Sequence, residues 1–414
     1  MPEPREKEMK LTRRMLLLGT MLSAALSMPS TEALAQNADP VQVGLIAPIS
    51  GIYARPGTVM RMGAELGVED VNAAGGIECL NGAPLELVVI DSGDSVEKAA
   101  NAAQRMVADY PGLVAATGSY LSSFTLAVTE ITERANLPVL TLSYSDLITG
   151  RDFKNVFQTS ATSGAQAEIA LPIIMNLAEE QTGKRPKTVA VITDNTAASL
   201  SSVERMKKGL LADVGLELVS EEVFTPPLSD ATSLVQEIRA RRPDLLFFLP
   251  TVISDSKLIL EKMQEFRVKV PTISFGIAIA EPEVLNTMQA ELLDGVMSAV
   301  ANWGVKGQEG LIKRLNEVYG EPWMTQNAVS TYGDMWLLKA ALEKSCSRDR
   351  EKLAETLRTS NFGPSQYYPG GTLSFDASGR REGASLTIIQ WQNGVPVTVF
   401  PEEMAVSAAK WPSE

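Results

Sequence analysis

Short apolar runs alternate with longer amphipathic stretches along most of this chain. The runs rich in β-branched residues predict strands at residues 41–46, 85–91, 113–117 and 139–142. Helices are expected between them, and the first helix should end at the paired glycines Gly75 and Gly76, which favour a left-handed stop. Strands that alternate with helices in this order are typical of a parallel α/β sheet.

The same alternation begins again after a polar stretch at residues 155–164, which we interpret as a crossover. The second unit is predicted to contain strands 188–192, 217–223, 245–249 and 272–275, and helices 200–214, 232–241 and 254–266. Further along, the pattern indicates a strand near 296–303, helices at 311–319 and 327–344, and a pair of strands at 373–375 and 386–391. A chain of 414 residues is too long for one compact core, so two domains are expected.

The N-terminus has the pattern of an export signal. Five basic residues precede an apolar run at residues 15–28, and Ala33-Leu34-Ala35 resembles a cleavage site. The apolar run is too short for a membrane span, which needs roughly twenty residues. We therefore predict a signal peptide at residues 1–35, with Met1 or Met9 as the start. Arg13 and Arg14 fit a twin-arginine leader, and they also fit an ordinary secretory leader.

The composition narrows the function classes. The chain contains no histidine, which excludes Ser-His-Asp and Cys-His catalysis and histidine-bearing zinc sites. A formal net charge of −13 disfavours binding to nucleic acid or to anionic lipid. Asp91, Asp94 and Glu97 lack the glycine-spaced pattern of a calcium loop. We expect neither a metal nor a cofactor.

The only cysteines are Cys79 and Cys346. In an oxidising compartment two cysteines of an exported protein often form a disulfide. Two buried free thiols fit the sequence equally well.

Serines follow two of the predicted strands at the point where each strand ends. Ser122 and Ser123 come after the third strand, and Ser143 and Ser145 come after the fourth. In an open parallel sheet, ligands bind beyond the carboxyl ends of the strands, where helix N-termini present free N–H groups. Hydroxyls at such places suit a small carboxylate, although serine is also a common helix cap.

Several colinear segments resemble a known family. The segment LIAPISGIYA at residues 45–54, NAAGGI at 72–77, NLP at 136–138 and LSFD at 373–376 are similar to leucine/isoleucine/valine-binding proteins, which are type I periplasmic solute-binding proteins of ABC importers. The resemblance implies two doubly wound parallel-sheet lobes joined by a three-segment hinge. It places residues 41–157 and 298–375 in the first lobe and residues 158–297 and 376–414 in the second.

The same resemblance implies a function without catalysis. A monomeric periplasmic protein would close its lobes over a small solute and deliver it to the permease subunits of an importer. The family's carboxylate-binding serine falls on Ser122, and its hydroxyl residue in the next loop falls on Ser145, with Ser143 close by.

The second lobe departs from the family's amino-acid binders. Asn195 and its neighbours replace a Tyr-Gly pair, and residues 274–278 contain no acidic partner for a ligand ammonium, whose desolvation costs several kcal/mol. An aromatic or aliphatic acid without an ammonium is therefore expected to bind better than leucine. Besides the serines, the remaining candidates for the cleft are Tyr53, Tyr144, Asp194, Asn195, Phe275, Gly276 and Trp303, whereas Phe247 and Phe248 fit a buried strand.

Two other interpretations remain. Ser95 to Lys98 and Ser254 to Lys257 both have the S-x-x-K spacing of exported serine hydrolases, but their partner motifs are missing and both serines stand at predicted helix starts. A ligand-binding sensor that docks on a signalling partner is the other alternative. The chain contains no output domain that would support it.

Overall fold

The computed structural model describes residues 38–370 and 372–411. The predicted signal peptide at residues 1–35 lies outside this part of the chain. No helix within the described part is both long and apolar enough to cross a membrane.

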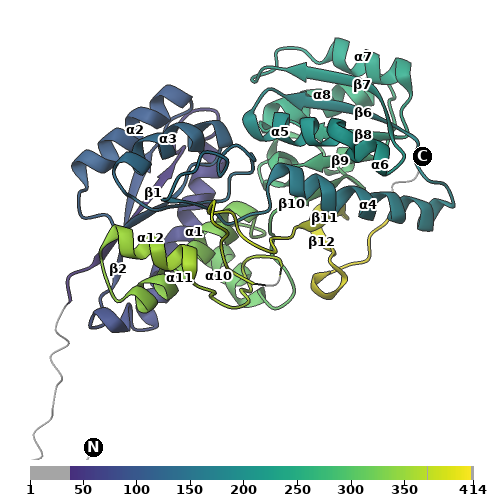
Figure 1. Cartoon of the computed structure of the whole chain (residues 1–414). Coiled ribbons are helices and arrows are strands. Elements are labelled where there is room, and N and C mark those ends of the chain that lie inside the picture. The colour runs from purple at the N-terminus through teal and green to yellow at the C-terminus, as the bar shows by residue number, and fades with distance from the viewer. Residues whose placement is uncertain (1–37, 371, 412–414) are drawn as a thin grey trace, which may run out of the picture. The chain divides into compact units, whose positions relative to one another are not determined.

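The first lobe is built on a five-stranded parallel sheet with the order β2-β1-β3-β4-β5. Neighbouring residues of β1 point to opposite faces: Leu45 packs with α1 and α11, and Ile46 packs with α2 and α3. Because helices cover both faces, the sheet is doubly wound, as predicted (Figure 1). Its elements are β1 Val41–Ala47, α1 Ala54–Ala73, β2 Leu85–Asp91, α2 Val96–Asp109, β3 Ala115–Gly118, α3 Ser122–Arg134, β4 Val139–Thr141 and β5 Val156–Gln158.

The second lobe contains a seven-stranded sheet with the order β12-β11-β10-β9-β8-β6-β7. Its strands pair in parallel except for β11, which pairs antiparallel with both β10 and β12. Ile192 faces α7 and α8, and Val191 faces α4 and α5. The elements are α4 Ser163–Thr182, β6 Thr188–Asp194, α5 Ala197–Arg205, α6 Leu211–Asp213, β7 Glu217–Phe224, α7 Thr232–Arg241, β8 Leu245–Leu249, α8 Ile253–Glu265, β9 Thr272–Phe275, α9 Val284–Thr287, β10 Met297–Val300, β11 Thr387–Gln392 and β12 Val395–Phe400.

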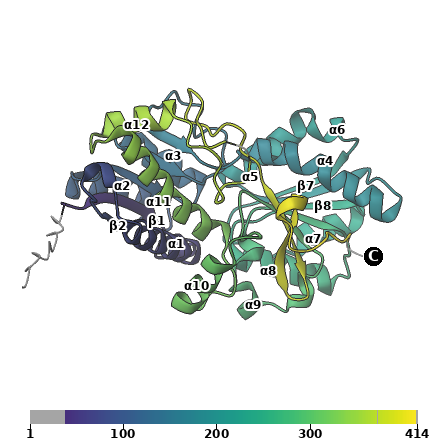
Figure 2. The same cartoon turned by 90° about the horizontal axis from the view of Figure 1, so that it is seen from below.

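Three helices between β10 and β11 return to the first lobe: α10 Glu309–Tyr319, α11 Gln326–Ser345 and α12 Arg350–Thr359. Helix α11 lies beside α1 (Figure 2). The two helices approach closely because Gly63 has no side chain; a Cβ there would lie 2.2 Å from the carbonyl oxygen of Ala328. Thr331 strengthens this contact by donating a hydrogen bond to the carbonyl of Met60 at 2.7 Å.

The chain therefore passes between the sheets three times. The crossings follow Gln158, Val300 and the bridge at Phe375. Two of the crossing segments are hydrogen-bonded to each other, since the amide of Gln158 donates to Gly379 and the amide of Arg381 donates to Gln158. This is the three-segment hinge that the resemblance implied.

Three local predictions were wrong. Residues 155–164 contain β5 and the start of α4, so the crossover is shorter than predicted. Residues 373–375 do not pair with 386–391; β11 pairs instead with β10 and β12. Strand β10 belongs to the second sheet, which places the second crossing after Val300 instead of at residue 298. The pattern also missed α12 and β12.

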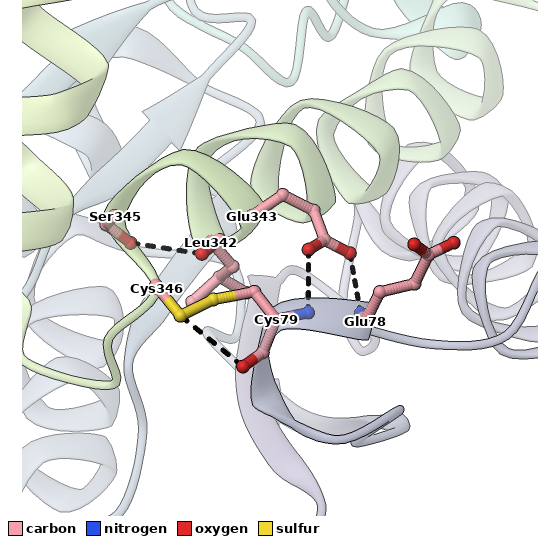
Figure 3. The surroundings of a disulfide bond; sticks show 6 residues. All are labelled: Glu78, Cys79, Leu342, Glu343, Ser345 and Cys346. Carbon is pink, nitrogen blue, oxygen red and sulfur yellow. Dashed lines mark hydrogen bonds between the residues drawn. A yellow bond between two sulfur atoms is a disulfide. The ribbon is translucent and has the colours of Figure 1, made fainter.

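A disulfide joins Cys79 to Cys346, with the two Cα atoms 5.5 Å apart. Cys79 lies in the short 3₁₀ helix Glu78–Leu80, and Cys346 follows the last residue of α11 (Figure 3). The carboxylate of Glu343 accepts hydrogen bonds from the amides of Glu78 and Cys79 at 2.7 and 2.9 Å. Both ends of the bridge belong to the first lobe, so it leaves the hinge free to move.

Candidate functional site

The loops that follow β3 and β4 are joined through Ser122. Its side-chain oxygen accepts hydrogen bonds from the amides of Tyr144 and Ser145 at 3.1 and 3.0 Å. Ser122 is 3% exposed and is the first residue of α3. A hydroxyl carries one donor and two acceptor positions, so its proton is left to donate to a bound group.

The turn before Ser122 has a strict steric requirement. Gly118 ends β3 with φ of 118°, and a Cβ at this position would lie 2.2 Å from the carbonyl oxygen of Ile46. The next residue, Ser119, also has a positive φ of 60°. This sharp turn brings the start of α3 to the carboxyl end of the sheet.

The other predicted serines have different surroundings. Ser143 is buried, and its hydroxyl contacts the carbonyl of Ser119 at 2.8 Å and the hydroxyl of Thr125 at 2.5 Å, so it holds the loop in place. The hydroxyl of Ser145 lies 2.9 Å from that of Ser201 in the second lobe. Ser123 is half-buried on α3.

A small cavity lies where the two lobes face each other. It is lined by Tyr144, Ser163, Gln166, Ala198, Ser202 and Phe275. Its volume of about 10 Å³ leaves room for roughly one water molecule. A larger solute would need the lobes to separate or the side chains to move.

Four of the six lining residues come from α4 and α5 in the second lobe, and three of them, Ser163, Gln166 and Ala198, lie in the first turns of these helices. Ser163 begins α4, which Thr162 caps by accepting the amide of Ala165. The N-terminal ends of helices present free N–H groups and partial positive charge. The sequence-based candidates include Tyr144 and Phe275 but not Ser163 and Gln166, because α4 itself was not predicted. Ala198 and Ser202 on α5 were also missed.

Aromatic rings form two walls of the cavity. The hydroxyl of Tyr144 is hydrogen-bonded to Gln326 and accepts the amide of Ala301 at 3.3 Å, and burial raises the pKa of Tyr144. The ring of Phe275 packs edge-on against Phe247, with centroids 5.4 Å apart. As predicted, Phe247 and Phe248 themselves are fully buried in β8.

Tyr53 lies in a separate aromatic cluster near the cavity. Its ring centroid is 6.1 Å from that of Tyr120 and 5.9 Å from that of Phe124. Burial, with a smaller effect of Asp194, raises the pKa of Tyr53 to about 12. Tyr120 donates a hydrogen bond to the carbonyl of Thr251 in the second lobe at 3.5 Å.

Asp194 has no free hydrogen-bonding capacity. One carboxylate oxygen accepts the amide and hydroxyl of Thr196 at 3.1 and 2.7 Å, and the other accepts those of Thr251 at 2.7 and 2.6 Å. The carboxylate therefore ties the end of β6 to the loop after β8.

The remaining candidates do not line the cavity. Asn195 is exposed and donates to the hydroxyl of Thr225, and Trp303 is 3% exposed within the core of the second lobe. Gly276 has φ of 151°, a conformation that favours glycine, and it follows directly after Phe275.

The cavity lining is uncharged. None of the six lining residues is acidic. The nearest acidic residue after positions 274–278 is Glu281, which is 1% exposed. Its carboxyl group is bound by the side-chain amide of Asn327 at 2.9 Å. Sequence reasoning overlooked this residue.

Neither S-x-x-K segment is arranged for catalysis. Ser95 caps α2 by accepting the amide of Lys98, whose ammonium pairs with Asp94 at 2.7 Å. Lys257 lies 3.8 Å from Glu261. Within the described residues, no group of three or more His, Cys, Asp or Glu side chains is placed to hold a metal ion.

A larger hollow of about 410 Å³ lies on the second lobe, between α8 and residues 285–292. Glu261 and Gln264, which border it, belong to the C-terminal half of α8. It therefore lies away from the carboxyl ends of the strands, where ligands of such sheets bind.

Two doubly wound lobes with a hydroxyl-lined cavity between them define a solute-binding protein. Residues 40–395 match the periplasmic binding protein family, and the chain belongs to that family. It is 27% identical to Leu/Ile/Val-binding protein homolog 8 of Brucella suis, over 97% of this chain and 100% of that protein.

Solved structures show the same fold. A branched-chain amino acid transporter substrate-binding protein from Streptococcus pneumoniae, solved with isoleucine, has a TM-score of 0.72 and 20% identity, and covers 87% of this chain and 100% of its own. A solute-binding protein from R. palustris, solved with benzoate, has a TM-score of 0.73 and 18% identity. The match covers 90% of this chain and 98% of that protein.

Proposed function

We propose that this protein binds a small carboxylate solute between its lobes and delivers it to the permease subunits of an ABC importer. The observation that carries the proposal is an uncharged cavity lined by hydroxyls of the second lobe and by Tyr144 of the first lobe, whose amide donates to Ser122. Ser122 offers its hydroxyl proton at the start of α3, Ser163 offers a hydroxyl at the start of α4, and Ser202 offers one from the second turn of α5. Helix N-termini favour an anion without a buried arginine.

The cavity lining favours an acid that lacks an ammonium group. None of the six lining residues is charged, and an ammonium buried there without a partner costs several kcal/mol. Tyr144 and Phe275 offer ring surfaces for an apolar or aromatic body. Fold similarity does not decide the ligand, since relatives solved with isoleucine and with benzoate resemble this chain equally well.

Closure of the cleft would follow from contacts between the lobes. Besides the pair of Ser145 and Ser201, the carboxylate of Asp146 accepts the amide of Gly164 at 3.1 Å. A solute that contacts both lobes shifts the population toward the closed form, which the importer recognises.

We further propose that the protein acts as a monomer and that Arg13 and Arg14 direct its export by the twin-arginine route.

The ligand class can be tested with pairs of compounds that differ in one group. Leucine and 4-methylpentanoate share a side chain but differ in the ammonium, and benzoate and benzamide differ in the carboxylate. We expect 4-methylpentanoate or benzoate to raise the unfolding temperature, and leucine and benzamide to have little effect. A ligand at one hundred times its Kd stabilises the native state by about 2.7 kcal/mol.

Thermal-shift measurements over these compounds, together with isoleucine, valine and small diacids, provide the readout. Strong stabilisation by leucine or valine, with none by 4-methylpentanoate, would contradict the acid proposal and assign an amino acid instead.

A further inference from the structure

A second polar cluster lies outside the cavity, at a junction between the lobes. Glu281 belongs to the second lobe, between β9 and α9, and is 1% exposed. Asn327 lies in the first turn of α11, which packs on the first lobe, and is fully buried. The side-chain amide of Asn327 donates to one carboxyl oxygen of Glu281 at 2.9 Å.

The nearby positive charge is already paired. Arg55, in the first turn of α1, contacts Glu283 at 2.5 Å and Glu321 at 2.9 and 2.5 Å. Its guanidinium forms no hydrogen bond with Glu281 among the described residues. The titratable groups around Glu281 are thus Arg55, Glu283, Glu321 and the hydroxyl of Tyr120.

Two oxygen atoms in this cluster lack a donor. The second carboxyl oxygen of Glu281, Oε2, and the amide oxygen of Asn327, Oδ1, are both buried and have no hydrogen-bond partner in the part of the chain that the structure describes. Each unsatisfied buried acceptor is destabilising. A single proton on Oε2 of Glu281 would turn it into a donor to Oδ1 of Asn327 and would satisfy both atoms.

We propose that Glu281 is a neutral carboxylic acid at neutral pH and that it forms a doubly hydrogen-bonded acid–amide pair with Asn327. The junction of the two lobes then contains a bound proton. The pair is independent of the solute cavity, because neither residue lines it.

The electrostatic surroundings agree with this arrangement. Burial raises the pKa of Glu281 to about 8, and the nearby charges of Glu283 and Glu321 act in the same direction. Arg55 and the hydrogen bond from Asn327 oppose the rise but do not outweigh burial. At pH 7 the protonated form therefore predominates.

The proton links folding to pH. The pKa of Glu281 is raised in the folded state above the ordinary glutamate value of about 4.3. Its stabilising contribution is therefore complete below about pH 4.3 and is lost as the pH rises through about 8. Over this window the folding equilibrium constant should fall by up to roughly tenfold per pH unit on account of this residue.

Glu281→Gln is the matched variant, since a glutamine has the shape and hydrogen-bonding groups of the neutral acid. Its oxygen accepts from Asn327, and its amide donates to Oδ1 of Asn327. We expect the folding constant of the wild type, divided by that of Glu281→Gln, to fall steadily between pH 5 and 8 in urea denaturation. A ratio that does not change with pH would overturn the proposal.

A direct titration of the wild type decides the question even if the variant does not fold. In protein labelled with ¹³C at glutamate carboxyl groups, one resonance should titrate with a midpoint near pH 8. As a control, Glu283→Gln removes a neighbouring negative charge and should lower this midpoint without abolishing the late titration. Titration of all glutamates below pH 6 would refute the neutral pair.

Discussion

Ser122→Ala is expected to weaken solute binding by roughly 10- to 150-fold. The hydroxyl of Ser122 is the proposed donor to the carboxylate, and a hydrogen bond to a charged group contributes about 1.5–3 kcal/mol. Alanine would also leave the amides of Tyr144 and Ser145 without the acceptor that fixes the loop after β4. Isothermal titration of the acid that gives the largest thermal shift in the compound series measures the loss.

Ser123→Ala is the matched control. Ser123 is the next residue on α3, whereas it is Ser122 whose hydroxyl accepts the amides of Tyr144 and Ser145. Its replacement should leave the affinity unchanged. Circular dichroism should show that both variants are folded, and equal binding by Ser122→Ala and the wild type would refute the role of Ser122.

Replacing both Cys79 and Cys346 with serine is expected to lower the free energy of unfolding by about 2–5 kcal/mol. The bridge closes a loop with a sequence separation of 267 residues, and a long loop restricts the unfolded chain strongly. Solute affinity should remain unchanged, because both residues lie in the first lobe and neither lines the cavity. Thermal unfolding of the variant and of the reduced wild type gives the measurement.

Peptide mapping without reduction checks the bridge itself. A linked pair of peptides containing Cys79 and Cys346 is expected. Two thiols that can be alkylated in the native protein, with the variant as stable as the wild type, would contradict it. Ser345→Ala, beside the bridge on α11, controls for local disturbance.

The sheet architecture could be predicted because its cause is local. Residues 41–46 and 188–192 have the apolar pattern of strands covered on both faces, and both segments form central strands of parallel sheets. The glycine at position 118 and the serine at position 122 mark a turn into a helix after a strand. Such short-range patterns are enough to place Ser122 at the carboxyl end of a sheet.

The wrong predictions share a different cause. Helix α4 has apolar residues around much of its circumference and contains Pro172, so its sequence has little helical periodicity. Strands β10 and β11 lie far apart in the sequence but pair antiparallel within the second sheet, so no local pattern indicates their pairing. Nothing in the local pattern of residues 373–375 reveals that β11 pairs with β10 instead.

The burial of Glu281 and its contact with Asn327 could not be predicted from the sequence. Residues 274–278, where amino-acid binders of the family carry an acidic residue, contain none, and Glu281 lies three positions later. Only the folded chain brings it beside Asn327, 46 positions away, and buries it. Burial, which depends on all surrounding segments, is what raises the pKa of Glu281.

The sequence by itself determined the two α/β units, the absence of histidine chemistry and the serines at the ends of the strands, because these depend on composition and on periodicity over a few residues. The tertiary structure decided which side chains meet. Of the predicted residues only Tyr144 and Phe275 line the cavity, and they are joined there by Ser163, Gln166, Ala198 and Ser202. The physical reason is that hydrogen-bond partners and burial arise from contacts between segments far apart in the chain, and local pattern does not encode those contacts.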